Sequence, residues 1–341
     1  MTFAIGLGTV TRNSDNKIIE AWFPEPLLSV PDTLQDQLGD LGYQGGNEVL
    51  ELRSSGLHII AQTMSEAGYD VTAQLAGRSV AYDADVVLVV LGSDEAPQSV
   101  AEGFLKLHLI SHRLVTPHGT NLTGLFGLLH NIAWTNKGPI DLPDLPERQM
   151  VARLSGETLS VDCVDKFPKM ADYVVPSGVR IADTARVRLG AYVGEGTTVM
   201  HEGFINFNAG TLGKGMIEGR ISAGVIVGDG SDLGGGCSTM GTLSGGGDIV
   251  ISIGENCLLG ANSGIGIPLG DRCTVESGLY ITAGTKVQML DDSQQPVDIV
   301  KARTLAGKSD LLFRRNSTNG QVECLTNKSA VALNEELHAN N

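Results

Sequence analysis

Hydrophobic residues recur at every sixth position in the second half of this 341-residue chain. The first run has six members: Val175, Ile181, Val187, Val193, Val199 and Ile205. Four positions after each member stands a residue that is mostly small: Val179, Ala185, Ala191, Thr197, Gly203 and Ala209. A period of six differs from the periods of a helix and of an ordinary strand. It predicts a β-helix, in which short strands stack into a prism.

The same period returns in three later frames, which together reach Val287. Their hydrophobic members are Ile221, Val227 and Leu233, then Ile253, Leu259 and Ile265, then Leu269, Val275, Ile281 and Val287. With three hexapeptides to a turn, these roughly 115 residues allow about five or six coils. The frame breaks at Thr211–Arg220 and again at Met240–Asp248. Insertions project from such a prism, so we expect these breaks to carry function.

The first 170 residues lack the six-residue period and alternate apolar strands with amphipathic helices. The pattern predicts strands at Phe3–Val10 and Asp85–Leu91 and helices at Asn47–Glu66, Val100–Leu114 and Leu122–Trp134. Near the other end, Asn319-Gly320 indicates a hairpin. The predicted fold is therefore an α/β N-terminal domain at 1–170, a parallel β-helix at 171–290, and a short C-terminal β segment at 291–341.

The charge and composition of the chain limit the classes of function and partner that it can have. A net charge of −15 argues against a nucleic-acid partner. No apolar run approaches the roughly 20 residues that span a bilayer, and the start of the chain lacks the features of a leader, so we predict no membrane association and a cytoplasmic location. The segment 301–315 contains five basic residues and only one acidic residue, Asp310. This local positive charge indicates either a site for an anionic ligand or a solvated loop. Three cysteines occupy small-residue positions, which predicts buried structural thiols: Cys237, Cys257 and Cys273.

Several motifs carry a more specific resemblance. The segments EGRISAG, MGTLSGGG and LLFRRNS, with VRIADTARVRLGAYVGEGTTVMHEGFINFNAGTLG before them, resemble the tetrahydrodipicolinate N-succinyltransferases, which belong to the hexapeptide-repeat acyltransferases. The resemblance covers most of the chain and is faint before about residue 100. It implies a left-handed β-helix, a homotrimer with active sites between neighbouring subunits, and succinyl transfer from succinyl-CoA to ring-opened, hydrated tetrahydrodipicolinate in lysine and diaminopimelate biosynthesis. The products would be N-succinyl-2-amino-6-oxopimelate and coenzyme A.

The resemblance also implies the site residues. Glu218 matches the catalytic residue, acting either as a nucleophile that forms an acyl anhydride or as a general base for direct attack of the amine. Arg220 suits a forked pairing with the succinyl carboxylate. The other positions that match contacts to succinyl-CoA are Gly235, Ser238, Ala261, Glu276, Ser277, Gly284, Lys301, Arg314, Arg315, Asn316 and Ser317.

A structural magnesium ion is a further implication of the resemblance. Glu202 matches a position at which relatives place a divalent cation on the trimer axis, and oxygen ligands suit Mg²⁺. Those relatives also supply an aspartate where this chain has Ala185. His201-Glu202 can equally be a polar patch at a subunit interface.

Other functions of a β-helix remain as alternatives. A zinc carbonic anhydrase needs three imidazoles, whereas His201 alone of the seven histidines lies in the repeat region. Other coenzyme A-dependent hexapeptide enzymes use an acetyl donor and typically a prism histidine as base. A non-catalytic scaffold would have no use for the Glu218-Gly219-Arg220 break or the basic C-terminal stretch.

Overall fold

The computed structural model describes residues 3–241 and 250–327, which divide into two compact units. The first unit comprises 1–115, 119–168 and 172–174, and the second comprises 116–118, 169–171 and 175–341. Among the described residues, no helix is long and apolar enough to cross a membrane.

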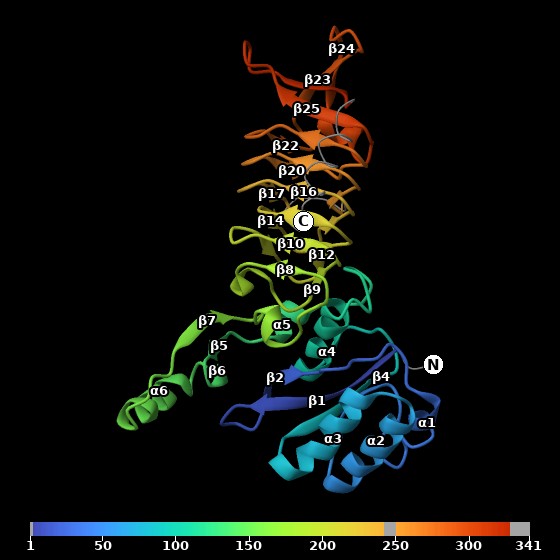
Figure 1. Cartoon of the computed structure of the whole chain (residues 1–341), viewed down its shortest axis with the longest axis vertical. Coiled ribbons are helices and arrows are strands. Elements are labelled where there is room, and N and C mark those ends of the chain that lie inside the picture. Colours follow the sequence, from blue (N-terminus) through green and yellow to red (C-terminus); the bar gives the residue numbers. More distant parts are fainter. Residues whose placement is uncertain (1–2, 242–249, 328–341) are drawn as a thin grey trace. The chain divides into compact units, whose positions relative to one another are not determined.

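The first unit contains an antiparallel sheet of order β2-β1-β4-β3. Its strands are β1 (Ala4–Arg12), β2 (Ile18–Trp22), β3 (Asn47–Glu51) and β4 (Val86–Leu91). Every residue of β4 is buried, because helices cover the sheet and the apolar run of this central strand has no solvated side. The helices of the unit are α1 (Asp32–Gln35), α2 (Ser54–Glu66), α3 (Asp70–Tyr82), α4 (Val100–Ser111), α5 (Leu125–Leu128) and α6 (Leu145–Leu154). Figure 1 shows α2 and α3 side by side near this sheet.

A second, three-stranded antiparallel sheet of the same unit has the order β6-β5-β7. It consists of β5 (Ile132–Thr135), β6 (Gly138–Asp141) and β7 (Val161–Asp165). The combination of strands and helices agrees with the predicted α/β region, and the predicted strands and the helix at Val100–Leu114 are found as β1, β4 and α4. The helix predicted at Asn47–Glu66 is wrong over β3, and most of the one predicted at Leu122–Trp134 is wrong, since β5 begins at Ile132.

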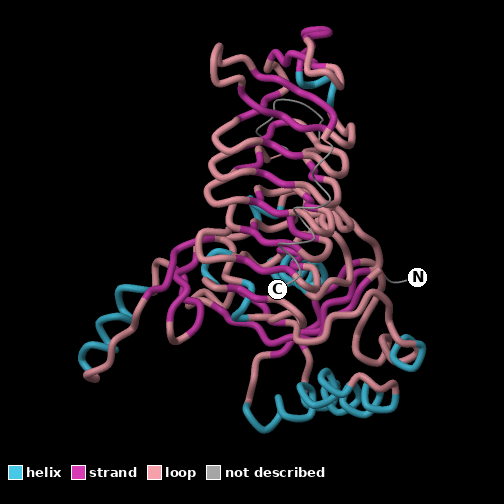
Figure 2. The backbone as a smooth tube through the Cα atoms, turned by 45° about the horizontal axis from the view of Figure 1, so that its top comes forward, coloured by secondary structure: helices cyan, strands magenta, loops and turns pink. Residues whose placement is uncertain are grey.

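The second unit is a stack of short parallel strands in three faces (Figures 1 and 2). The first face contains β8 (Arg180–Ile181), β10 (Thr197–Val199), β13 (Gly215–Ile217), β16 (Asp232–Leu233), β19 (Leu258–Leu259) and β21 (Thr274–Val275). The second face contains β11 (Phe204–Ile205), β14 (Arg220–Ile221), β17 (Ser238–Thr239), β20 (Gly264–Gly266) and β22 (Tyr280–Thr282). The third face contains β9 (Ala191–Val193), β12 (Ala209–Thr211), β15 (Ile226–Val227) and β18 (Ser252–Ile253).

The predicted hydrophobic column fills the inside of this stack, and the β-helix prediction is confirmed. Val187, Val199, Leu233 and Val275 are each at most 1% exposed. Val175 and Ile181 are the exceptions: Val175 is 68% exposed because it precedes the first stacked strand, and Ile181, which lies in that first strand, is only partly buried. Three short 3₁₀ segments occur at Met170–Asp172, Thr184–Arg186 and Ala302–Leu305.

The C-terminal β segment extends the first face. It contains β23 (Lys286–Leu290), β24 (Pro296–Lys301), β25 (Leu311–Arg315) and β26 (Val322–Thr326). β25 pairs in parallel with β21 and antiparallel with β26. The predicted hairpin at Asn319-Gly320 is confirmed, with Gly320 at φ +76° in the turn.

The register of the strands corrects the first predicted break. Thr211 lies opposite Val193 and Val227, and Ile217 lies opposite Val199 and Leu233, so both residues belong to the repeat. The frame shifts only because Ile217 and Ile221 are four positions apart, which shortens one corner to Glu218 and Gly219. The second break, by contrast, is an insertion between β17 and β18. Most of it, 242–249, lies outside the described residues.

Candidate functional site

Five of the predicted site residues lie on one edge of the stack, which we name the first corner: Glu218, Gly235, Ala261, Glu276 and Ser277. It consists of the turns that lead from the first face to the second face, beginning at Glu218, Gly234, Gly260 and Glu276 in successive coils. Each of these four residues donates its backbone N–H to a carbonyl of the next coil, at 2.7 to 2.9 Å. These hydrogen bonds hold the four turns directly above one another.

The first corner brings Gly235, Ala261 and Glu276 into line with Glu218. The Gly236 N–H donates to the Glu218 carbonyl at 3.4 Å, and the Asn262 N–H donates to the Gly235 carbonyl at 2.9 Å. Between the third and fourth turns of the corner, the Gly278 N–H donates to the Ala261 carbonyl at 2.8 Å. The turns are small and largely solvent-facing, so a long, thin ligand can lie along them.

The basic C-terminal strand continues the same column. The Arg315 N–H donates to Glu276 Oε2 at 2.6 Å, which joins β25 to the fourth turn of the first corner. Four steps from Glu218 to Arg315, at about 4.8 Å each, span roughly 19 Å. A cation therefore stands at one end of the column and a carboxylate at the other.

Glu218 sits in the shortened corner, half-buried, with its carboxylate toward Gly235. A methyl group at Gly235 would lie 3.3 Å from Glu218 Oε2. Cys237 lies next to this corner, because a methyl group at Gly219 would meet its Sγ. Burial, and secondarily the charge of Glu218, raise the pKa of Cys237 to about 12, so this thiol stays protonated and is not a nucleophile at neutral pH.

Arg220 is the first residue of β14, the strand of the second face that follows this corner. Its Nε and Nη2 both donate to Ser238 Oγ, at 3.2 and 2.9 Å, and its side chain is exposed. The two residues are paired across β14 and β17. Two predicted site residues, Arg220 and Ser238, are therefore in direct contact, and two nitrogens of the guanidinium share one hydroxyl oxygen as acceptor.

Gly284 and Lys301 come together in a separate place, at the β23–β24 hairpin. The Ala302 N–H donates to the Thr285 carbonyl at 2.8 Å, and the Arg303 N–H donates to the Ala283 carbonyl at 3.2 Å. A methyl group at Gly284 would contact no described residue within 4 Å, apart from its chain neighbours, and Lys301 is exposed. The surface here is open.

Arg314 and Asn316 are occupied within the C-terminal hairpin. Arg314 Nε donates to Glu323 Oε2 at 2.9 Å, and Asn316 Nδ2 donates to Glu323 Oε1 at 2.8 Å. These bonds lower the pKa of Glu323, first through Asn316 and then through Arg314. Ser317 lies exposed in the hairpin turn. Arg315 is thus the member of this group that the structure connects to the first corner.

Glu202 has His201 beside it but belongs to no larger group of metal-binding side chains within the described part of the chain. Its carboxylate is exposed and lies 3.9 Å from His201 Nε2. Within residues 3–241 and 250–327, no group of three histidine, cysteine, aspartate or glutamate side chains is placed to hold a metal ion. A cation at Glu202 would need carboxylates from further copies of the chain.

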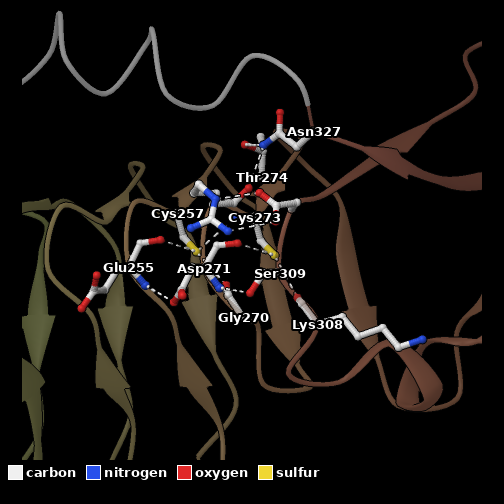
Figure 3. A network of polar contacts seen from close by, with 11 residues as sticks. Glu255, Cys257, Gly270, Asp271, Cys273, Thr274, Lys308, Ser309 and Asn327 are labelled. Atoms are coloured by element: carbon white, nitrogen blue, oxygen red, sulfur yellow. Dashed lines mark hydrogen bonds and ion pairs between the residues drawn. The ribbon is translucent and has the colours of Figure 1, made fainter. Parts of the chain in front are cut away.

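The in-frame cysteines are buried, as predicted. Cys257 and Cys273 stack in adjacent coils, where the Cys273 N–H donates to Cys257 Sγ at 3.3 Å (Figure 3). Their S–H groups donate to the carbonyls of Gly270 and Lys308, at 3.1 and 3.3 Å. The interaction with the side chain of Cys273, together with burial, raises the pKa of Cys257, whereas the Cys273 N–H acts in the opposite direction. This ladder holds coils together.

Stacked coils built from six-residue repeats, with a line of turns that runs from the carboxylate of Glu218 to Arg315, define a hexapeptide-repeat protein of the acyltransferase type. Two family models agree: "Hexapeptide repeat of succinyl-transferase" matches 250–283, and "Tetrahydrodipicolinate N-succinyltransferase middle" matches 129–169. The chain belongs to the tetrahydrodipicolinate N-succinyltransferase family, as its relatives show.

Two of these relatives are named 2,3,4,5-tetrahydropyridine-2,6-dicarboxylate N-succinyltransferase. The protein from Vibrio cholerae is 67% identical over 340 residues, 99% of each chain. The one from Pseudomonas putida is 59% identical, over 99% of this chain and 98% of its own. A crystal structure of a Campylobacter jejuni protein, described as a 2,3,4,5-tetrahydropyridine-2-carboxylate N-succinyltransferase, is 34% identical. It aligns with a TM-score of 0.88 over 97% of this chain and 93% of its own. These names disfavour the carbonic anhydrase, the acetyl-donor enzyme and the scaffold.

Proposed function

We propose that this protein transfers the succinyl group of succinyl-CoA to the amine of hydrated, ring-opened tetrahydrodipicolinate. The products are N-succinyl-2-amino-6-oxopimelate and coenzyme A, within lysine and diaminopimelate biosynthesis. Relatives at 59% to 67% identity over essentially the whole chain, with their printed names, support this activity.

One observation of the structure supports the position of the site: Glu218, Gly235, Ala261, Glu276 and Arg315 form one hydrogen-bonded column. A coenzyme A thioester is long, with a reacting carbonyl at one end and phosphates at the other. The column offers the carboxylate of Glu218 at one end and the basic residue Arg315 at the other, with Gly235, Ala261 and Glu276 between them. We therefore place the thioester at Glu218, the pantetheine arm along the first corner, and the phosphates toward Arg315.

Glu218 would act in the reaction in one of two ways, as a general base or as a nucleophile. As a general base it takes a proton from the amine while nitrogen attacks the thioester carbonyl; the C–N bond forms, the C–S bond breaks, and the thiolate of coenzyme A leaves and is protonated. As a nucleophile it first displaces the thiolate to form an acyl anhydride, which the amine then opens. Both routes need the carboxylate near the turn formed by Gly235.

Arg220 would distinguish a succinyl donor from a neutral acyl donor. Arg220 follows Glu218 by two residues in the chain, and the present partner of its guanidinium is the oxygen of Ser238. A carboxylate is a stronger acceptor for this fork than a hydroxyl group, because the hydrogen bonds become charge-assisted. The free carboxylate of the succinyl group fits this position.

The assembly and the ion follow from the family resemblance. We place a cytoplasmic homotrimer of left-handed β-helices here, with sites between neighbouring subunits. Glu202 and its symmetry mates would then meet at the trimer axis, where three carboxylates can share Mg²⁺. Since one chain does not form the ion site by itself, no step of the reaction is assigned to the metal.

The test is release of coenzyme A from succinyl-CoA, followed by titration of the free thiol. With both substrates present, we expect one thiol for each succinylated amine, after subtraction of an enzyme blank because Cys163 is exposed. No release by purified trimer would overturn the proposed function. Faster turnover with acetyl-CoA would overturn the role given to Arg220.

A further inference from the structure

Thr239 is a polar residue in an otherwise aliphatic column. The inward positions of the second face in successive coils are Ile205, Ile221, Thr239, Ile265 and Ile281. Thr239 is only 2% exposed. Burying a hydroxyl group is unfavourable unless it forms hydrogen bonds, so an isoleucine would serve the core better at this position.

The hydroxyl group of Thr239 bonds to the strand that carries Arg220. Thr239 Oγ1 donates to the Arg220 carbonyl at 3.2 Å and accepts from the Ser222 N–H at 3.0 Å. Ser222 Oγ in turn donates to the Thr239 carbonyl at 2.7 Å. We name this pair of hydroxyl groups the hydroxyl bridge.

The hydroxyl bridge lies where the backbone pairing is short. β14 pairs with β11 at two positions, as does β17 with β20, whereas β14 and β17 are paired only at Arg220 and Ser238. On one side of Arg220, its N–H donates to the Cys237 carbonyl at 2.8 Å. On the other side, its carbonyl accepts from the Thr239 hydroxyl group. Both peptide groups that flank the Arg220 Cα are thereby held.

We propose that Thr239, completed by Ser222, is a positioning residue that aims Arg220 at the free carboxylate of the acyl donor. The inference rests on the proposed function, in which Arg220 binds that carboxylate. β14 is only two residues long, so the direction of its side chains depends on the hydrogen bonds at its ends. A bidentate contact is sensitive to the direction of the guanidinium, and the hydroxyl bridge fixes the backbone from which it projects.

The experiment compares two donors in three variants. Succinyl-CoA carries the terminal carboxylate, and n-butyryl-CoA has a methyl group in its place. Thr239→Val removes the hydroxyl group at equal volume, and Thr239→Ser retains it. Thr211→Val makes the same change at an inward position of the third face, where the hydroxyl group bonds to Thr197 at 2.8 Å.

We expect Thr239→Val to lower the ratio of kcat/KM for succinyl-CoA over butyryl-CoA by about 3- to 10-fold, chiefly through KM for succinyl-CoA. Thr239→Ser, which retains the hydroxyl group, should keep the ratio near the wild-type value. Thr211→Val should leave the ratio at the wild-type value. A purely structural role would move both donors equally, so the ratio separates positioning from stability.

An unchanged ratio in folded Thr239→Val would overturn the inference. If that variant does not fold, Ser222→Ala decides: a lowered ratio supports the hydroxyl bridge, and an unchanged ratio rejects it. Wild-type protein that turns over succinyl-CoA without preferring it to butyryl-CoA would reject the role of Arg220, and the inference with it. Wild-type protein without any turnover would instead reject the proposed function itself.

Discussion

A methyl group at Gly235 should impair the reaction without impairing the fold. Gly235 is half-buried in the second turn of the first corner, and its φ lies outside the left-handed region, so alanine can adopt its backbone conformation. Among the residues that the structure describes, the only heavy atom within 4 Å of the added Cβ, apart from its chain neighbours, is Oε2 of Glu218, at 3.3 Å. The perturbation therefore falls on one carboxylate.

The size of the effect follows from this distance. A contact of 3.3 Å is tight, so the carboxylate must shift by a few tenths of an ångström or rotate away. A misplacement of 1 Å in a catalytic group can cost about 100-fold in rate, so we expect kcat to fall by about 10- to 100-fold in Gly235→Ala. The free energy of unfolding should change by less than about 1 kcal/mol, since the side chain of Glu218 can move toward solvent.

The assay is steady-state release of coenzyme A at saturating succinyl-CoA, with thermal unfolding measured in parallel. Gly77→Ala is the matched control: it lies in α3, contacts nothing within 4 Å, and should raise stability by about 0.5 to 1 kcal/mol with kcat unchanged. Wild-type kcat in Gly235→Ala would refute the placement of Glu218 at the reacting carbonyl. A rise in KM alone would assign Gly235 to cofactor contact only.

Three further predictions address other parts of the molecule. Glu218→Gln should keep the wild-type melting temperature and lose at least about 100-fold in kcat, because the amide cannot accept the amine proton; near-normal turnover removes Glu218 from the mechanism. Burial lowers the pKa of His108 from 6.5 to about 3, so the folded state binds fewer protons than the unfolded state between these values, and stability falls as pH drops from 6.5. Urea unfolding, followed by the two tryptophans of the first unit, should show a loss of about 1.4 kcal/mol per pH unit that His108→Gln reduces; equal slopes contradict this assignment. Gly210→Ala should cost at least about 2 kcal/mol, seen as a lowered melting temperature, because its methyl group would overlap the backbone carbonyl of Tyr192; an unchanged melting temperature rejects this contact.

The six-residue period predicted the β-helix well, because a repeat that buries one position per strand leaves little freedom in register. The prediction of a break over Thr211–Arg220 is nevertheless too wide, because Thr211 and Ile217 keep the register of the repeat. The structure shows that only the corner at Glu218 and Gly219 is shortened. Corner lengths are set by how each turn stacks on its neighbour, which hydrophobic periodicity does not record.

The N-terminal unit was harder to predict, for a tertiary reason. The segment Asn47–Glu51 directly precedes the residues of helical spacing that form α2, but it pairs along its whole length with β4. Ile132–Thr135 likewise pairs with two strands, β6 and β7. Such partners lie far away in sequence, and pairing with them overrides local preference.

The candidate site was named from motifs, but its geometry was not predictable from them. Glu218, Ala261 and Glu276 are 43 and 15 positions apart in sequence, and only the stacking of coils places them in one column. The role inferred for Thr239 did leave a signal in the sequence: a hydroxyl residue at a position where the repeat calls for an aliphatic one. That signal acquires meaning only beside Arg220, which the strand register places next to it.

The most direct test of the central claim is a crystal structure of the protein with coenzyme A bound. The first corner predicts the thiol next to Glu218 and Gly235, the pantetheine arm along Ala261 and Ser277, and the phosphates toward Arg315. Coenzyme A along either of the other two corners of the prism, or with its thiol at the Arg315 end, would contradict the account.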